Sequence, residues 1–248
     1  MKKLIITCSL LLSSFVLMAQ TNAEAIIRRS EALLRGEHSY SEMTITIVRP
    51  TWERSMQLRI WSDEPDYMVM IIDAPARDKG TVFLKRGQEI WNYLPRIGRN
   101  VKLPPSMMGQ SWMGSDLNND DLVRENSIVE DYTYQYLGEK EIRGVPCHQI
   151  RLDPKPETAV VWDHIILYIT KEGDFQWQTD FYDERQQLIN RLEAFDLAQW
   201  GGKTLPSRMR MTPMETPDQY TEMRYNHLDF SVKQAENFYS LQNLQRLR

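Results

Sequence analysis

The chain has 248 residues, 42% of them hydrophobic, and carries 30 Lys and Arg against 34 Asp and Glu, a formal net charge of −4. Because the charges are interspersed along an acidic chain, we expect neither nucleic acid nor an anionic membrane surface as a partner. The length fits one large β domain, and no linker rich in Pro, Ser or Gly divides it.

The N-terminal stretch MKKLIITCSLLLSSFVLMA is typical of a secretion signal. Two lysines precede an apolar run that contains Cys8 and ends at Ala19, a small residue suited to cleavage. The run is shorter than the roughly 20 residues that a membrane-spanning helix needs. We expect a signal peptide over residues 1–19 and a single exported, soluble domain over residues 20–248. Cys147 is then the only cysteine left, so packing and not a disulfide must hold the fold.

The next segment predicts one amphipathic helix. Asn22 is a suitable N-cap and Gly36 a suitable stop, and small or apolar side chains recur between them near helical spacing. The expected buried side consists of Ala25, Ile26, Ile27, Ser30, Leu33 and Leu34.

From Tyr40 onward the hydrophobic period changes to two, as in β-strands. Met43, Ile45 and Ile47 alternate with polar residues, and Met56, Leu58 and Ile60 do the same. Short turns, not helices, separate the segments, so we expect eleven to thirteen antiparallel strands. The later strands are expected at Tyr67–Asp73, Thr81–Arg86, Glu89–Leu94, Asn100–Leu103, Tyr132–Leu137, Val145–Leu152, His164–Thr170, Phe175–Tyr182, Leu188–Phe195, Ser207–Met211 and Tyr220–Leu228.

An irregular insert interrupts the strands between Pro104 and about Glu125, with two short helical turns expected, and Val232–Leu247 is compatible with a final helix. A sheet this large cannot stay flat, because strand twist accumulates. The predicted class is therefore mainly β with a few helices (α+β). We expect a strongly curved antiparallel sheet forming a half-barrel, its concave face covered by the N-terminal helix and the mid-chain helical insert. Such a shape leaves an apolar cavity where ligands bind.

Within the insert, SWMGSDLNNDDL first suggests a calcium loop. Asp116, Asn118 and Asp120 occupy positions 1, 3 and 5 of such a loop, but Asp121 stands where it needs glycine and Ser127 where it needs glutamate. The better interpretation makes Asn118 the N-cap of a helix with both later aspartates in its first turn. We therefore predict no metal site here.

Catalytic motifs are not supported elsewhere either. Ser111 lies in GQSWMG, which has one residue too many before its second glycine for a nucleophile elbow. The four histidines are dispersed without metal-ligand spacing, and no Gly-rich phosphate loop is present. We expect neither an enzyme nor a cofactor.

Methionine is abundant, with 13 residues, and several alternate along the expected strands. Its flexible thioether can repack around an apolar guest or fill an ordinary core, so both interpretations stay open. Met107, Met108, Trp112 and Met113 fall in the irregular insert and must dock somewhere. If they dock in the mouth of the curved sheet, they form a plug or lid that a ligand can displace.

The stretch Trp91–Leu122 resembles the signature of the LolA-like outer-membrane lipoprotein-sorting proteins. In that group a Tyr-Leu-Pro strand end is followed by basic residues and then by an aromatic-Met-Gly-Ser-Asp segment that leads into acidic residues. The layout of signal peptide, first helix, antiparallel series and short final helix is similar over almost the whole mature chain. The matching positions are Tyr93, Leu94, Pro95, Arg96, Arg99, Lys102, Trp112, Met113, Gly114, Ser115, Asp116, Asp120 and Asp121.

The resemblance implies a half-barrel whose internal hydrophobic cavity, closed by helices, shields lipid acyl chains in the periplasm without covalent chemistry. It also implies an inner-membrane export pump and an outer-membrane acceptor as partners. We therefore predict a monomeric periplasmic carrier that takes up acyl chains of lipoprotein or lipid and delivers them towards the outer membrane. The alternative is a non-carrier adaptor or structural protein associated with an envelope export complex.

The expected ligand-binding residues lie on the apolar faces of the strands and in the insert. The choice of strand face depends on register, and an error of one residue reverses it. This set is Met43, Ile45, Met56, Leu58, Met68, Met70, Trp91, Trp112, Met113 and Leu117. Arg96, Arg99 and Lys102 are expected either to meet an anionic headgroup or partner at the rim or to be solvated turn charges.

Overall fold

The computed structural model describes residues 23–33, 37–63, 66–87, 89–119, 121, 128–156 and 161–247. The predicted signal peptide lies outside these ranges, as do Asn22 and Gly36, the expected ends of the first helix. Within the described ranges, no helix is both long and apolar enough to cross a bilayer.

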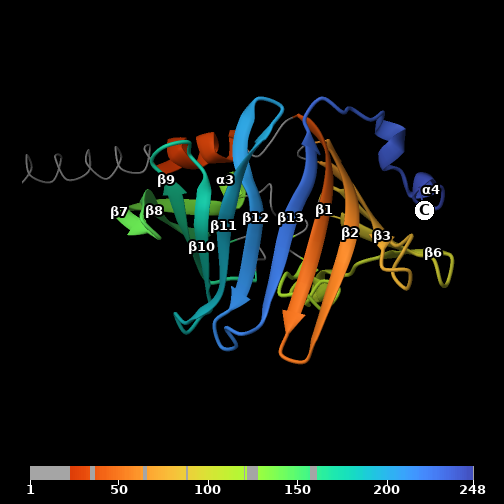
Figure 1. The fold of residues 1–248 in the computed structure, drawn as a ribbon, viewed down its shortest axis with the longest axis horizontal. Coiled ribbons are helices and arrows are strands. Elements are labelled where there is room, and N and C mark those ends of the chain that lie inside the picture. The colour runs from red at the N-terminus through yellow and green to blue at the C-terminus, as the bar shows by residue number, and fades with distance from the viewer. Residues whose placement is uncertain are drawn as a thin grey trace, which may run out of the picture.

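Thirteen strands form one curved, open antiparallel sheet (Figure 1), at the upper end of the expected number. The first meander comprises β1 (His38–Arg49), β2 (Trp52–Asp63), β3 (Tyr67–Ala74), β4 (Val82–Arg86), β5 (Glu89–Leu94) and β6 (Arg99–Lys102). The second comprises β7 (Tyr132–Ile142), β8 (Val145–Pro154), β9 (His164–Thr170), β10 (Gln176–Tyr182), β11 (Leu188–Trp200), β12 (Lys203–Pro213) and β13 (Tyr220–Asp229). Strands β1 and β13 pair in the middle and join the two meanders, which leaves β6 and β7 as the edges.

The period of two correctly predicts which side chains share a face. Met43 lies opposite Leu58, and Ile45 lies between Met56 on β2 and Met223 on β13. All five belong to one buried hydrophobic cluster. We call the face that carries them the inner face and the opposite one the outer face.

The helix over residues 23–33, red in Figure 1, packs on the inner face. Ala23, Ile26 and Ile27 are buried in the same cluster as the strand residues. The phase of this helix differs from the expected one at Ala25, which is exposed, whereas Glu31 is buried. Positions three and four apart share a helix face, so Ala23, Ile26 and Ile27 face the sheet together. Ala25 is not on that face and stays exposed.

The chain between the two meanders is the predicted irregular insert. It begins with the 3-10 turn η1 (Pro105–Met107) and ends with α3 (Ile128–Asp131). The part between residues 122 and 127 lies outside the described ranges.

The C-terminal segment packs on the outer face of β3 to β5, where Tyr239 and Leu244 are buried beside Val69, Leu84 and Tyr93. It does not form the continuous helix with which Val232–Leu247 is compatible. Two short turns, η2 (Glu236–Tyr239) and α4 (Leu241–Leu244), flank Ser240, whose backbone is extended at φ −106° and ψ 150°. The hydroxyl of Ser240 caps α4 by accepting from the Asn243 N–H, so this residue ends one turn and begins the next.

Candidate functional site

The inner-face cluster contains nine of the ten residues expected to bind a ligand. Met68 and Met113 pack against it from its margin and are partly buried. The seven that are buried within it are Met43, Ile45, Met56, Leu58, Met70, Trp112 and Leu117. The structure thus brings together residues from the three strands β1, β2 and β3 and from the insert.

Trp91 is the exception, because it lies on the outer face. It is opposite Leu84 on β4 and Lys102 on β6, and it packs against the cluster of Tyr239. Strand alternation places Ile90 and its even-numbered neighbours on the inner face, so Trp91 was assigned to the wrong side.

The sequence interpretation missed the contribution of the second meander to the cluster. Strand β9 is buried along its whole length, so the run HIILYIT shows no alternation that would reveal its inner side. The missed members include Ile150, Leu152, Ile165, Leu167, Ile169 and Phe181 from the second meander, together with Phe83 on β4.

Residues 111–121 fold back on themselves as a compact loop, which we call the Trp112 loop. The Trp112 N–H donates to the Leu117 carbonyl at 2.8 Å, and the Ser115 hydroxyl donates to the Trp112 carbonyl at 2.7 Å. Met113 and Gly114 form its tip with positive φ values of 53° and 77°. A methionine in this left-handed region is strained, so surrounding contacts must hold it there.

The end of the loop is a capping box. The Asp121 N–H donates to Asn118 Oδ1 at 2.8 Å, and the Asn118 N–H donates back to the Asp121 carboxylate at 2.8 Å. Asn118 is therefore the N-cap that the sequence predicts. Asp120 lies outside the described residues, and within them no group of three or more His, Cys, Asp or Glu side chains is placed to hold a metal ion.

Two arginines fasten the Trp112 loop to the β1–β2 end of the sheet. Arg49 forms a two-pronged ion pair with Asp116 at 2.9 and 3.0 Å, and the Thr221 hydroxyl donates to the same carboxylate at 2.7 Å. Arg54 donates to the carbonyl of Met113. Partial burial lowers the pKa of the Arg54 guanidinium. The Trp112 loop is thus held by two arginines, one at Asp116 and one at Met113.

Trp112 is the apolar centre of this loop. Its side chain is 1% exposed, and its ring lies 5.6 Å from that of Phe83. The Nε1 atom of the indole is buried and has no hydrogen-bond acceptor among the described residues. The ring of Trp112 therefore packs within the inner-face cluster, while its Nε1 atom lacks a hydrogen bond.

The helix over residues 23–33 also makes polar contacts with the second meander. Arg29 pairs with Asp174 in the β9–β10 turn at 2.9 Å, and the Arg29 side chain is 53% exposed. Lys203 donates to the Leu33 carbonyl at 3.3 Å in a partly buried contact. The Arg29–Asp174 pair thus lies nearer the surface than the Arg49–Asp116 pair of the Trp112 loop.

The three basic residues expected at the rim occupy different environments. Arg96 and Arg99 are exposed in and after the β5–β6 turn, beside the exposed side chain of Ile97. Lys102 instead pairs with Glu89, and its ammonium lies 5.6 Å from the centre of the Trp91 ring on the outer face.

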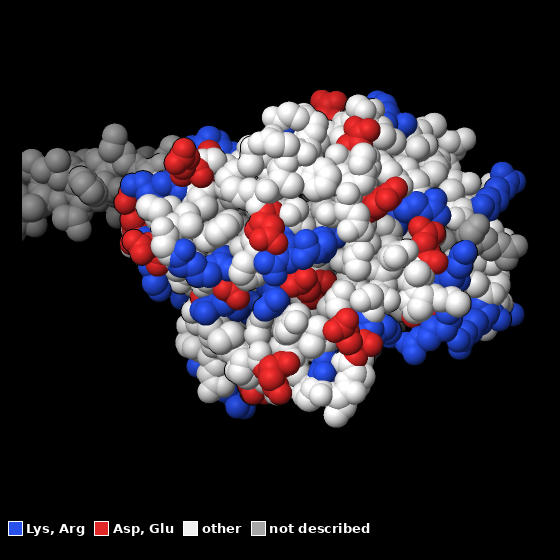
Figure 2. All heavy atoms as spheres, in the orientation of Figure 1, with Lys and Arg blue, Asp and Glu red and all other residues white. Residues whose placement is uncertain are grey.

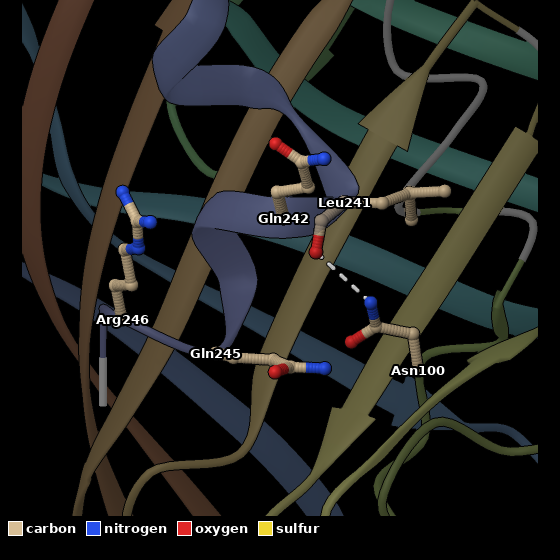
Figure 3. A pocket seen from close by; sticks show the side chains of 5 residues that line it. All are labelled: Asn100, Leu241, Gln242, Gln245 and Arg246. Carbon is tan, nitrogen blue, oxygen red and sulfur yellow. Dashed lines mark hydrogen bonds between the residues drawn. The ribbon is translucent and has the colours of Figure 1, made fainter.

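A shallow depression lies where the C-terminal segment crosses the outer face (Figure 3). Asn100 Nδ2 donates to the Leu241 carbonyl at 2.9 Å across its floor, and the remaining lining residues are Gln242, Gln245 and Arg246. This open, polar surface offers little apolar contact to a lipid, in contrast to the inner face.

Charged side chains form a band across the outer face over β10 to β13 (Figure 2). Arg208 and Arg210 both pair with Glu222, and their guanidinium groups lie 4.6 and 5.8 Å from the centre of the Phe195 ring. The acids and bases neutralise one another there. The two faces of the middle strands thus differ in chemistry: the outer face is charged and the inner face is apolar.

The fold resembles several solved structures. A DUF1329 family protein from Desulfovibrio piger superposes with a TM-score of 0.84 at 22% identity, over 91% of this chain and 99% of that one. An outer-membrane lipoprotein-sorting protein domain from Vibrio parahaemolyticus gives 0.81 at 22% identity, over 92% and 100%. A LolA superfamily protein from Nitrosomonas europaea gives 0.76 at 17% identity, over 89% and 98%. At these identities the similarity establishes the fold.

No curated protein sequence matches the chain. Residues 64–246 match a family model described as "Uncharacterized protein". This match includes the Tyr-Leu-Pro and Trp-Met-Gly-Ser-Asp motifs and the eleven strands from β3 to β13. The chain belongs to the family of this model, and its fold is the one seen in the LolA superfamily protein from Nitrosomonas europaea.

Proposed function

We propose that this chain is a periplasmic carrier that shields the acyl chains of a lipoprotein or lipid and delivers them towards the outer membrane. The observation that carries the proposal is the apolar inner face, which is roofed by a helix and a Trp-Met loop instead of by a second sheet. The name of the lipoprotein-sorting domain with the same fold supports it. The carrier needs no catalytic group, since uptake and release are non-covalent.

In this proposal the curved sheet is a half-barrel whose concave side is the inner face, and the cavity lies between that face and its covers. Its lining comprises the nine clustered residues Met43, Ile45, Met56, Leu58, Met68, Met70, Trp112, Met113 and Leu117. Trp91 is left out because it packs on the other face. The methionines then serve both as core in the empty protein and as adaptable contacts for a guest.

The burial of hydrocarbon provides the driving force for uptake. Each buried methylene contributes about 0.8 kcal/mol, so a long acyl chain supplies roughly 10 kcal/mol. In the empty protein the cluster is closed by its own side chains, so cargo must replace contacts that Ile26 and Ile27 make with the sheet. This exchange lowers the net affinity and keeps release to an acceptor possible.

From the sequence, Trp112 and Met113 are expected to form a plug or lid that a ligand can displace. In the proposed mechanism the roles differ from that expectation: the helix over residues 23–33 is the cover that moves, and the Trp112 loop is a fixed wall. The loop is held by the Arg49–Asp116 pair, whose side chains are only 14% and 10% exposed. The helix is held at its edge by the exposed Arg29–Asp174 pair. Exposed pairs are weak compared with buried hydrogen-bonded ones, so the helix opens first.

The proposed setting follows from the expected signal peptide and the family. A monomer collects cargo from an inner-membrane export pump and passes it to an outer-membrane acceptor. Arg96 and Arg99, exposed on the β5–β6 turn, meet an anionic headgroup or the partner protein. Lys102 pairs with Glu89 on the outer face of the same sheet edge.

The direct test is native mass spectrometry with lipid extraction on protein purified from its own periplasm. Co-purified lipid or lipoprotein and saturable uptake of a fluorescent acyl probe are expected. The double variant Trp112→Ala/Met113→Ala should weaken probe binding, while Trp91→Ala, an aromatic deletion on the other face, should leave it unchanged. Absence of co-purified lipid together with no probe uptake would reject the carrier.

The moving cover has its own test. Cysteines at Arg29 and Asp174, joined by a short bismaleimide, should stop probe uptake and release. The matched control places the same link at the exposed pair of Glu139 and Lys171, which does not involve the helix. Equal exchange in both linked proteins would show that the helix does not open. The native thiol of Cys147 interferes little, because burial raises its pKa to about 11.

One observation favours the alternative, an adaptor that docks another envelope protein. Ile97 and Val101 are 59% and 41% exposed on the β5–β6 edge, close in sequence to Arg96 and Arg99. An apolar and basic edge of this kind suits a protein partner. If Ile97→Ser abolishes partner capture in the cell while acyl-probe binding is absent in the wild type, the adaptor is the better description.

A further inference from the structure

The indole N–H of Trp112 is a buried donor without a protein partner. The side chain is 1% exposed, and its Nε1 atom is among the buried polar atoms that no protein group meets. Such a group costs free energy comparable to a lost hydrogen bond. An unsatisfied donor at the centre of an apolar cluster calls for an explanation in terms of function.

Two other tryptophans help to interpret this observation. Trp177 and Trp200 also have Nε1 atoms without a protein acceptor, but both side chains are only partly buried. Trp91, on the outer face, donates to the Glu89 carboxylate at 3.3 Å. Trp112 alone among these four combines near-complete burial with an unmet donor.

An unmet acceptor lies close by on the same face. Phe83, whose ring contacts that of Trp112, is the cross-strand partner of Asn92 on β5. Cross-strand partners project to the same side of the sheet with their Cβ atoms roughly 5 Å apart. The Oδ1 atom of Asn92 is buried and has no protein donor. A donor and an acceptor therefore flank Phe83 within the inner face.

We propose that Trp112 Nε1 and Asn92 Oδ1 form a polar subsite that binds the carbonyl group at the head of an acyl chain. The proposal rests on the carrier function and adds the chemical class of its cargo: acyl esters and amides, in preference to chains without a carbonyl. The indole N–H can only donate, which matches a carbonyl oxygen. Asn92 Oδ1 can accept from the N–H of an amide.

The donor is held in place before cargo arrives. Trp112 belongs to the loop fastened by the Arg49–Asp116 pair, and its backbone N–H is bonded to Leu117. A pre-positioned donor in an apolar site loses little entropy when it binds, so it can discriminate between ligands of equal chain length. The subsite thereby fixes how deep the chain enters, with the hydrocarbon among the methionines and the carbonyl at Trp112.

The test compares three lipids of identical chain length: a diacyl glycerol ester, its dialkyl ether analogue and an N-alkyl fatty amide. The full protein should bind the ester or the amide on the order of tenfold more tightly than the ether, the effect of about one hydrogen bond. Trp112→Phe, which keeps a ring but removes the N–H, should abolish the preference, whereas Trp91→Phe should preserve it.

Replacement of Trp112 by 3-benzothienylalanine, which has the shape of tryptophan without the N–H, separates hydrogen bonding from packing. It should retain ether binding and lose the carbonyl preference. In ¹⁵N-labelled protein, the indole resonance that disappears in Trp112→Phe should shift on addition of ester or amide and not of ether.

The possible outcomes distinguish a failure of the carbonyl subsite from a failure of the carrier function. Equal binding of all three lipids by the wild type would overturn the carbonyl subsite and leave the carrier intact. Binding of none of them would count against the carrier itself. A preference for amide over ester would assign the natural carbonyl to an N-acyl group and confirm the role of Asn92, and the variant Asn92→Leu should then remove that preference.

Discussion

The guanidinium of Arg49 donates two hydrogen bonds, of 2.9 and 3.0 Å, to the carboxylate of Asp116, which lies 67 positions later in the sequence. Arg49 is the last residue of β1, and Asp116 lies in the Trp112 loop. This pair connects the sheet to the Trp-Met-Gly-Ser-Asp motif. In the proposed carrier it keeps the Trp112 loop fixed while the helix over residues 23–33 moves.

Removal of Asp116 should destabilise the whole fold. In Asp116→Ala the Arg49 guanidinium, 14% exposed, keeps its charge with only backbone carbonyls as acceptors, and we expect a loss of roughly 3 kcal/mol in the free energy of unfolding. Urea denaturation should show a lower midpoint with an unchanged slope. The matched variant Asp196→Ala removes the partner of Arg208 at the surface and should shift the midpoint much less. Equal shifts would show that the loop is not fastened by this pair.

The C-terminal segment should contribute strongly to stability through Leu244. This side chain is fully buried on the outer face beside Tyr239, so Leu244→Ala should cost roughly 2–5 kcal/mol. Leu197 is 49% exposed, and Leu197→Ala should stay within about 0.5 kcal/mol of the wild type. A thermal or urea unfolding series compares them. A negligible effect of Leu244→Ala would mean that the segment leaves the sheet in solution.

His148 should make the protein less stable as the medium becomes mildly acidic. Burial lowers the pKa of His148 below its ordinary value of 6.5, so the unfolded chain binds more protons in that range. The folded state therefore loses stability as the pH falls through 6.5. The unfolding midpoint of His148→Gln, measured from pH 7.5 to pH 5.5, should fall less than that of the wild type. Parallel curves would contradict the assignment.

Cys147 should react slowly with thiol reagents in the folded protein. The residue is buried, and burial raises the pKa of its thiol to about 11, so little thiolate is present near neutral pH. Mass spectrometry of the peptide that contains Cys147 should show slow modification in buffer and rapid modification in urea. An introduced Leu137→Cys, at a position 42% exposed, supplies the fast reference in the folded state. Similar rates at both sites would mean that the outer face of β8 opens easily.

Local periodicity was sufficient to predict most of the fold and much of the candidate site. Alternation in Met43–Ile47 and Met56–Ile60 correctly identified the inner side of both strands, because the opposite side carries polar residues. Alternation did not identify the inner face where both sides of a strand carry apolar residues. Trp91 is apolar but packs under the C-terminal segment, and the outer side of a strand can be as buried as its inner side when another element covers it.

The contacts that turn the cluster into a site could not be read from the sequence. The Asn118–Asp121 cap was predictable because its partners are three residues apart. The pairs Arg49–Asp116 and Arg29–Asp174 join residues 67 and 145 positions apart, so only the folded chain identifies them. The unmet indole donor of Trp112 is also a property of its surroundings and not of its residue type.

The sheet remains open because β6 and β7, its two edges, do not pair with each other. In a closed barrel the radius is set by strand number and shear, so the interior has one size. An open sheet has no such constraint, and small rotations between neighbouring strands add up to a wider or narrower gap between its edges. A carrier built in this way can adjust its internal volume to bulky or slender guests while every main-chain hydrogen bond of the sheet stays intact.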